Sequence, residues 1–98
     1  AAFFDSKCKF LGDSLIATGS VSYAYISPAE LFRKALIRNA VMIVVLHNHP
    51  SGDPAPSDED IRMTEDLNRG AKLLGLKLAD HIVIGDHQYF SFHENQLL

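Results

Sequence analysis

The chain has 98 residues, of which 47% are hydrophobic and 21% are charged, and its formal net charge is −3 at pH 7. This length predicts one domain, residues 1–98, with a single core, and the composition is typical of a folded globule. The apolar runs are far shorter than the about 20 residues that cross a bilayer, which argues against a membrane protein. The negative net charge disfavours nucleic acid as a partner, since proteins that bind it usually carry a basic face.

The N-terminal residues Ala1 to Asp5 lack the basic start and the long apolar stretch of a signal peptide. They resemble the interior of a sequence, so we expect the chain to be a fragment of a longer protein. Cys8 is the single cysteine. It excludes an internal disulfide and a cysteine-ligated zinc cluster, and it favours a cytoplasmic protein.

The first third of the chain is predicted to form three strands. Residues 1–5 and 10–18 should pair antiparallel across a turn, and a bend at Gly19-Ser20 should precede a third strand over residues 21–26. Exposed early strands of this kind can pair with a second copy, so a homodimer is one expectation.

A helix start follows these strands. Ser27 is a typical N-cap, Pro28 suits the first helical position, and Glu30 stands where it would complete a capping box. Apolar residues then recur at helical spacing, which predicts a helix that ends near Asn39.

The rest of the chain alternates strands and helices. Residues 41–46 form an uninterrupted β-branched run, typical of a central strand covered on both faces. A proline-rich loop over residues 50–56 leads to a helix that begins at Ser57 and stops at Gly75. Residues 76–84 and 88–92 should form a hairpin. The order β-β-β-α-β-α-β-β predicts an α+β fold with a mixed sheet and helices packed against it.

One constellation carries chemistry. His47 and His49 stand two residues apart at the end of the central strand, so their side chains should leave the same face. Asp60, on the next helix, could complete a set of three metal ligands. Three protein ligands and an open position are the pattern of a catalytic zinc site. Ser57, if its hydroxyl faces the metal, could stabilise an oxyanion.

Each of these residues has a plainer interpretation. Ser57 and Asp60 fit a capping box before an apolar helix. Asp53 could orient a ligand histidine or simply make an Asx turn. His81 lies within a strand pattern and is better interpreted as a packed, hydrogen-bonded histidine than as a fourth ligand.

The string His47-x-His49-x7-Ser57-x2-Asp60 resembles the JAMM motif of the MPN (JAB) metalloprotease superfamily. The surrounding His-Asn-His-Pro-Ser-Gly-Asp-Pro sequence over residues 47–54 resembles the RadC-like branch. Further matches lie along the whole chain, at Phe4-Asp5, Gly19-Ser20, Pro28-x-Glu30 and Asp80-His81-x-Val83-x-Gly85.

The resemblance implies a cytidine-deaminase-like JAB/MPN fold, a curved mixed sheet flanked by helices, with Zn²⁺ held by His47, His49 and Asp60. Ser57 would be the motif serine. Relatives in the ubiquitin-linked branches cleave isopeptide bonds, so a peptide or protein substrate is implied. The RadC-like branch takes its name from DNA repair.

The sequence departs from this family at the general base. The superfamily uses a glutamate on an early strand, and RadC-like chains carry it five residues before the glycine that Gly19 matches. That position is Ser14. Asp13 is adjacent, but strand alternation aims it at the opposite face unless a bulge near Gly12 shifts the register. Glu30 is better explained by its helix start.

Three functions therefore compete. The first is zinc-dependent hydrolysis of peptide or isopeptide bonds. The second is a metal-binding interaction module with little or no catalysis, because Ser14 stands where the base is expected. The third, nucleic-acid binding within a repair protein, rests on the family name and is disfavoured by charge.

Overall fold

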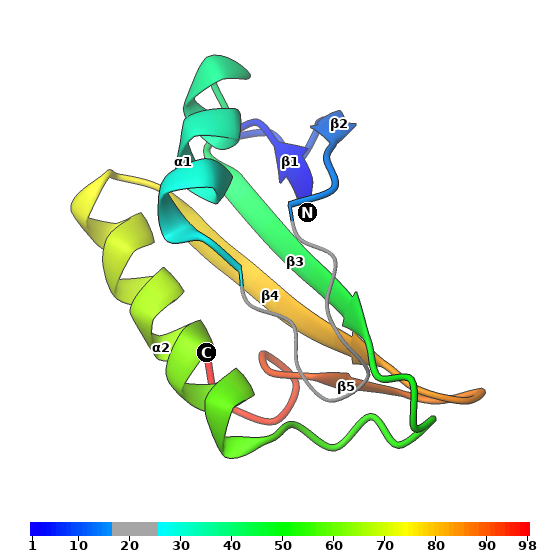
Figure 1. Cartoon of the computed structure of the whole chain (residues 1–98). Helices are drawn as coiled ribbons and strands as arrows, with labels where there is room; N and C mark the ends of the chain where they lie inside the picture. Colours follow the sequence, from blue (N-terminus) through cyan, green and yellow to red (C-terminus); the bar gives the residue numbers. More distant parts are fainter. Residues whose placement is uncertain (17–25) are drawn as a thin grey trace.

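The computed structural model describes residues 1–16 and 26–98, and these form one mixed sheet with two helices (Figure 1). The elements are β1 (Ala2–Phe4), β2 (Phe10–Asp13), α1 (Pro28–Ile37), β3 (Met42–Asn48), α2 (Asp58–Leu73), β4 (Lys77–Ile84) and β5 (Tyr89–Ser91). The predicted α+β class with a mixed sheet is confirmed.

The sheet has the order β2-β1-β3-β4-β5, so β3 lies at its centre. β3 pairs parallel with β4, and α2 makes the crossover between them, as a parallel pair requires. The remaining pairs, β1–β2, β1–β3 and β4–β5, are antiparallel.

Both helices begin with a serine cap, as the sequence predicts. The Ser27 hydroxyl accepts the Glu30 amide N–H at 3.4 Å, and Pro28 opens α1. The Glu30 carboxylate pairs with Lys34 on the next turn at 3.1 Å instead of closing the predicted capping box, so α1 has only the Ser27 half of that box. α2 has a full capping box and ends before Gly75, whose φ of +73° suits glycine.

The core lies between the helices and one face of the sheet. Side chains that alternate along β3, Ile43 and Val45, are buried against apolar residues of both helices. The opposite face of β3 is more open, and Leu46 is 42% exposed. The expectation that this strand is covered on both faces was therefore wrong for Leu46, because α1 and α2 pack on the Ile43 and Val45 side (Figure 1).

The early strands are shorter than predicted. β1 spans three residues and β2 ends at Asp13, so residues 14–16 of the second predicted strand are not in a strand, and its residues 17 and 18 lie outside the described part of the chain. The predicted bend at Gly19-Ser20 and most of the predicted third strand, residues 21–25, lie outside the described part of the chain. Ile26, the last residue of that prediction, is not in a strand.

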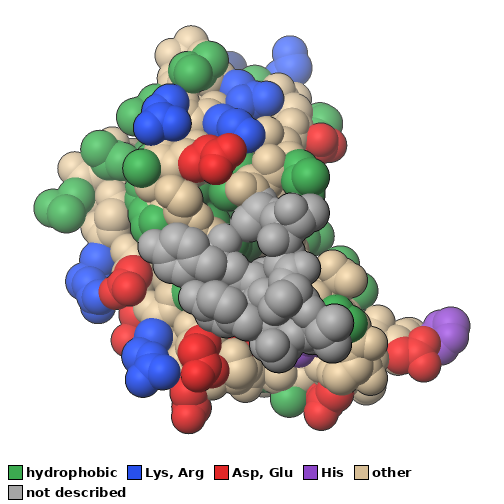
Figure 2. Space-filling view, viewed as in Figure 1, with side chains coloured by type: hydrophobic (Ala, Val, Ile, Leu, Met, Phe, Trp, Pro, Cys, Tyr) green, Lys and Arg blue, Asp and Glu red, His purple; other side chains and the backbone are tan. Residues whose placement is uncertain are grey.

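The surface carries charges of both signs on the face that Figure 2 shows, with apolar side chains between them. Several large apolar residues are exposed, including Leu73 and Ile37. Within the described part of the chain, neither α1 nor α2 is long and apolar enough to span a membrane.

Candidate metal centre

His47, His49 and Asp60 converge at the carboxyl end of the parallel pair β3–β4. His47 lies near the end of β3, His49 follows that strand directly, and Asp60 lies in the first turn of α2. Each offers one ligand atom, and these atoms lie within 4.8 Å of one another. In α/β proteins this edge of a parallel sheet is where ligands usually bind.

The loop after β3 is fixed by its contacts with β4 and the turn that follows it. The His49 amide donates to the Ile84 carbonyl at 3.0 Å, and the Asp86 amide donates to the Gly52 carbonyl at 2.7 Å. A Cβ at Gly85 would lie 2.4 Å from the Gly52 oxygen, so only glycine permits this approach. The proline-rich loop thus holds His49 through backbone contacts.

Asp53 has both of the roles considered for it: its backbone carbonyl orients the His49 ring, and its carboxylate makes an Asx turn. His49 Nδ1 lies 2.9 Å from the Asp53 carbonyl oxygen, which can only accept, so Nδ1 carries a proton. In the neutral ring, Nε2 then presents a lone pair. The Asp53 carboxylate meanwhile accepts the Ala55 amide at 3.0 Å, which is the Asx turn.

Asp60 is part of the α2 capping box and also one of the three candidate metal ligands, His47, His49 and Asp60, which we call the ligand group. Its Oδ2 accepts the Ser57 amide at 2.9 Å, and its own amide donates to the Ser57 hydroxyl at 3.1 Å. The capping-box interpretation is therefore confirmed, and the carboxylate also faces both histidines. Burial raises the pKa of the Asp60 carboxyl, but the bonds from Ser57 and the two imidazoles outweigh it and leave the pKa below its ordinary value.

His47 approaches the same carboxylate from β3. Its Nε2 lies 3.5 Å from Asp60 Oδ1, and the His49 Nε2 lies 3.1 Å from Asp60 Oδ2. Burial lowers the pKa of His47; Asp60 opposes this shift and His49 adds to it. A lower pKa favours the neutral imidazole, which is the form that binds metal.

The donor set fits a zinc ion, which binds imidazole nitrogen and carboxylate oxygen at about 2.0–2.2 Å. The two imidazoles contact different oxygens of the Asp60 carboxylate, at 3.5 Å for His47 and 3.1 Å for His49. One ligand atom from each of the three residues lies within 4.8 Å of the others. A cation between His49 Nε2 and the Asp60 carboxylate would be attracted to both of these donor atoms. Two imidazoles and a carboxylate suit zinc among the common metals.

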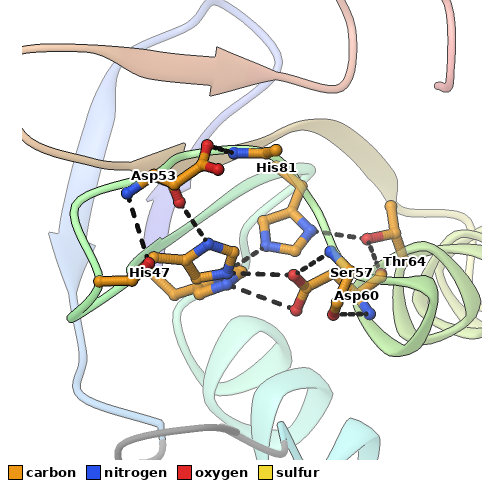
Figure 3. A network of polar contacts seen from close by, with 9 residues as sticks. His47, Asp53, Ser57, Asp60, Thr64 and His81 are labelled. Carbon is orange, nitrogen blue, oxygen red and sulfur yellow. Dashed lines mark hydrogen bonds and ion pairs between the residues drawn. The ribbon is translucent and has the colours of Figure 1, made fainter.

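His81 lies between His47 and Thr64, and Thr64 stands beside Asp60 on the same helix (Figure 3). His81 is 0% exposed. Its Nε2 lies 2.7 Å from His47 Nδ1, and its Nδ1 lies 2.6 Å from Thr64 Oγ1. The prediction of a packed, hydrogen-bonded histidine is confirmed. Sequence reasoning missed Thr64, although its place four residues after Asp60 on α2 puts both on one helix face.

A bulge in β4 turns His81 toward the site. The register with β3 shifts at Ala79, so that both Leu78 and His81 are buried on the core face. Asp80 holds this geometry: its carboxylate accepts the His81 amide at 2.7 Å and the Ser91 hydroxyl at 2.6 Å.

Ser14 is brought to the site, and Asp13 is not. The Ser14 amide donates to the Ala1 carbonyl at 2.9 Å, and both residues line a small pocket of about 70 Å³ that Val45 and His47 also line. Asp13 pairs instead with Ala2, whose other partner is Val44, and it is exposed. Alternation places Asp13 on the face opposite His47.

The β1–β2 pairing is regular at Gly12 and Asp13, so no bulge there turns the Asp13 side chain to the face of the sheet that carries His47. β2 does contain a bulge, in which Leu11 is the extra residue, but it lies before the Ala2–Asp13 pair. Gly12 has a φ of +133° and pairs with Phe3. Ser14 thus shares a pocket with His47, and Asp13 does not line that pocket.

Known proteins resemble this chain over nearly its whole length. The model of the RadC-like JAB domain family matches residues 1–97. A UPF0758 protein of Methanosarcina acetivorans is 42% identical to this chain over 94% of its length, and one of Desulfitobacterium hafniense is 45% identical over 95%. A UPF0758 protein of Protochlamydia amoebophila is 42% identical over 100% of it. The chain spans about two fifths of the length of these relatives, 40% to 42%. It belongs to the RadC-like JAB domain family.

Proposed function

We propose that this domain binds Zn²⁺ through His47, His49 and Asp60 and is a zinc-dependent hydrolase of amide bonds in peptides or isopeptide-linked proteins. The observation that carries the proposal is the convergence of two imidazole nitrogens and one carboxylate within 4.8 Å. Three protein ligands leave a fourth zinc position for water or substrate. Zinc there would polarise an amide carbonyl and lower the pKa of water toward about 7.

The residues of the chain have defined parts in this proposal. His49 is oriented by the Asp53 carbonyl, and Asp60 is held by the Ser57 amide. The Ser57 hydroxyl accepts the Asp60 amide, which leaves its own proton free to donate to an oxyanion. The pocket beside His47 is lined mostly by apolar side chains, including Leu15, Ile26 and Leu31, and would receive an apolar part of a substrate.

The proposed hydrolase requires a general base that accepts a proton from the attacking water, and the chain has a serine, Ser14, at the position expected for it. A serine hydroxyl is not a base near neutral pH, and Asp13, on the opposite face, is poorly placed to replace the glutamate of the family. Loss of a general base costs typically about 10²–10⁴-fold in rate. Ser14 in the pocket therefore favours a second candidate function, a metal-binding module whose hydrolysis is slow and whose main activity is binding a protein.

The wider setting is also part of the proposal. We expect a peptide or protein partner in the cytoplasm, with a homodimer as one form. DNA repair enters through the family name alone, and the net charge of −3 makes this domain a poor candidate for contacting the nucleic acid.

Substitution of Ser14 separates the two candidate functions. In Ser14→Glu the carboxylate would enter the pocket beside His47, and we expect chelator-sensitive cleavage of a fluorogenic isopeptide or peptide substrate to rise about 10²-fold or more. Ser14→Gln is the matched control, because it adds the same volume without a base. Equal activity in the two variants, both loaded with zinc, would contradict a hydrolase that lacks only its base.

A further inference from the structure

His81 has no place among the three ligands, yet it is wholly buried against one of them. Its ring stacks on Phe92, with centroids 4.7 Å apart and planes 6° from parallel. Its two nitrogens contact His47 and Thr64 at 2.7 and 2.6 Å. A buried imidazole with both nitrogens bonded has a defined tautomer, and the partners decide which one.

The direction of the bonds starts at Thr64. The Thr64 hydroxyl lies 2.7 Å from the Asp60 carbonyl oxygen, which can only accept, so the single hydroxyl proton points there. The Thr64 oxygen must then accept in its other contact. His81 Nδ1, 2.6 Å away, is the donor of that bond and carries the ring proton.

The same logic continues to His47. His81 is 0% exposed, and its carboxylate neighbour Asp80 bonds its backbone rather than its ring, so the neutral ring is favoured. A neutral ring protonated at Nδ1 accepts at Nε2. The His47 Nδ1 at 2.7 Å therefore donates, which leaves the lone pair of His47 on Nε2, the atom 3.5 Å from Asp60 Oδ1.

We propose that Thr64 and His81 are positioning residues that fix the proton of His47 on Nδ1 and so aim its Nε2 lone pair at the metal position. The proposal rests on the proposed zinc site for its purpose, but the tautomer itself is a property of the metal-free protein. The chain of bonds begins at the Asp60 carbonyl and ends beside the Asp60 carboxylate. One residue thus anchors both ends of it, as Figure 3 shows.

The two ligand histidines are fixed by separate parts of the fold. His49 depends on a backbone carbonyl in the loop, that of Asp53, whereas His47 depends on side chains of β4 and α2. Partners of this kind set the orientation and basicity of a ligand, and their loss typically costs about 10–100-fold in metal affinity. A change at Thr64 should therefore affect His47 and leave His49 unchanged.

The first test is ¹⁵N NMR of the histidine rings in metal-free protein near neutral pH, with the exposed His87 and His93 as internal references. We expect His47 and His81 to be neutral and protonated at Nδ1. A proton on Nε2 of His47 would overturn the proposal, since that tautomer requires the chain of bonds to run in reverse. This result does not depend on zinc binding.

The second test compares Thr64→Val with Thr64→Ser. Valine keeps the shape but removes the acceptor, so we expect His47 to populate the Nε2–H tautomer and zinc affinity to fall about 10–100-fold. Serine retains the hydroxyl and should keep wild-type values for both. Wild-type affinity and an unchanged His47 tautomer in folded Thr64→Val would refute the role of Thr64. If the wild-type protein binds no zinc while His47 keeps its Nδ1 proton, the zinc proposal fails and the tautomer assignment stands.

Discussion

Ser14 and His47 line the same small pocket, one just after β2 and the other on β3. The strand register explains this relationship, since Ser14 bonds to Ala1 at the point where the β1–β2 hairpin meets the site. The position where the family resemblance places the general base therefore lies in the pocket beside His47, and the chain carries a serine there.

Gly85 should control the metal site from a distance. In Gly85→Ala the new Cβ would collide with the Gly52 carbonyl and with Pro54, so the loop that holds His49 must shift. We expect zinc affinity, measured by competition with a chromophoric chelator, to fall about 10-fold or more. Gly75→Ala is the control: its φ of +73° makes the change destabilising by about 1 kcal/mol, but no atom lies near its Cβ. Equal zinc affinity in both variants would show that the loop does not set the site.

The two serine caps offer a matched pair. Ser57→Ala and Ser27→Ala each remove an N-cap and should lower the free energy of unfolding by about 1 kcal/mol in urea titrations. Of these two serines, Ser57 bonds to Asp60 and Ser27 does not, so Ser57→Ala alone should also weaken zinc binding. If Ser27→Ala weakened zinc binding as much, the effect would come from general destabilisation.

Acid should destabilise the metal-free protein through its buried histidine. Burial, with a further contribution from His47, lowers the pKa of His81 to about 4, whereas the unfolded value is 6.5. Between these values the unfolded state binds more protons, so stability is full above pH 6.5 and falls as the pH decreases toward 4. At about 1.4 kcal/mol per pH unit the loss is roughly 3 kcal/mol, and the lowered pKa of His47 acts in the same direction.

The measurement is urea unfolding from pH 7.5 to 4.5 in the presence of a chelator. His81→Phe should reduce the slope of stability against pH over this range. His87→Gln, at an exposed position in the β4–β5 turn, should leave the slope unchanged. A slope that is the same in His81→Phe and wild type would exclude His81 as its source.

Much of the fold could be predicted from sequence because its signals are local. The Ser27-Pro28 start, the glycine after α2 and the β-branched run of β3 each gave an element close to its observed bounds. The ligand group could be predicted because His47 and His49 are close in sequence and Asp60 follows a loop of fixed length. The prediction of these three residues as a group therefore required no knowledge of the tertiary structure.

The rest depends on contacts between distant segments. The exposure of Leu46 follows from both helices packing on the other face of the sheet, which a run of apolar residues does not reveal. The position of Asp13 follows from the register of the β1–β2 hairpin, including its bulge at Leu11. The bond between Thr64 and His81 joins α2 to β4, and only the three-dimensional structure brings them together.

The zinc content of the purified protein tests the metal site most directly. We expect one zinc per chain by elemental analysis after loading and removal of excess metal, with loss of the ion in His47→Ala and in Asp60→Asn. Asp58→Asn, on the first turn of the same helix, is the control and should retain one zinc. Full zinc content in both His47→Ala and Asp60→Asn, or none in folded wild type after loading, would contradict the proposed site.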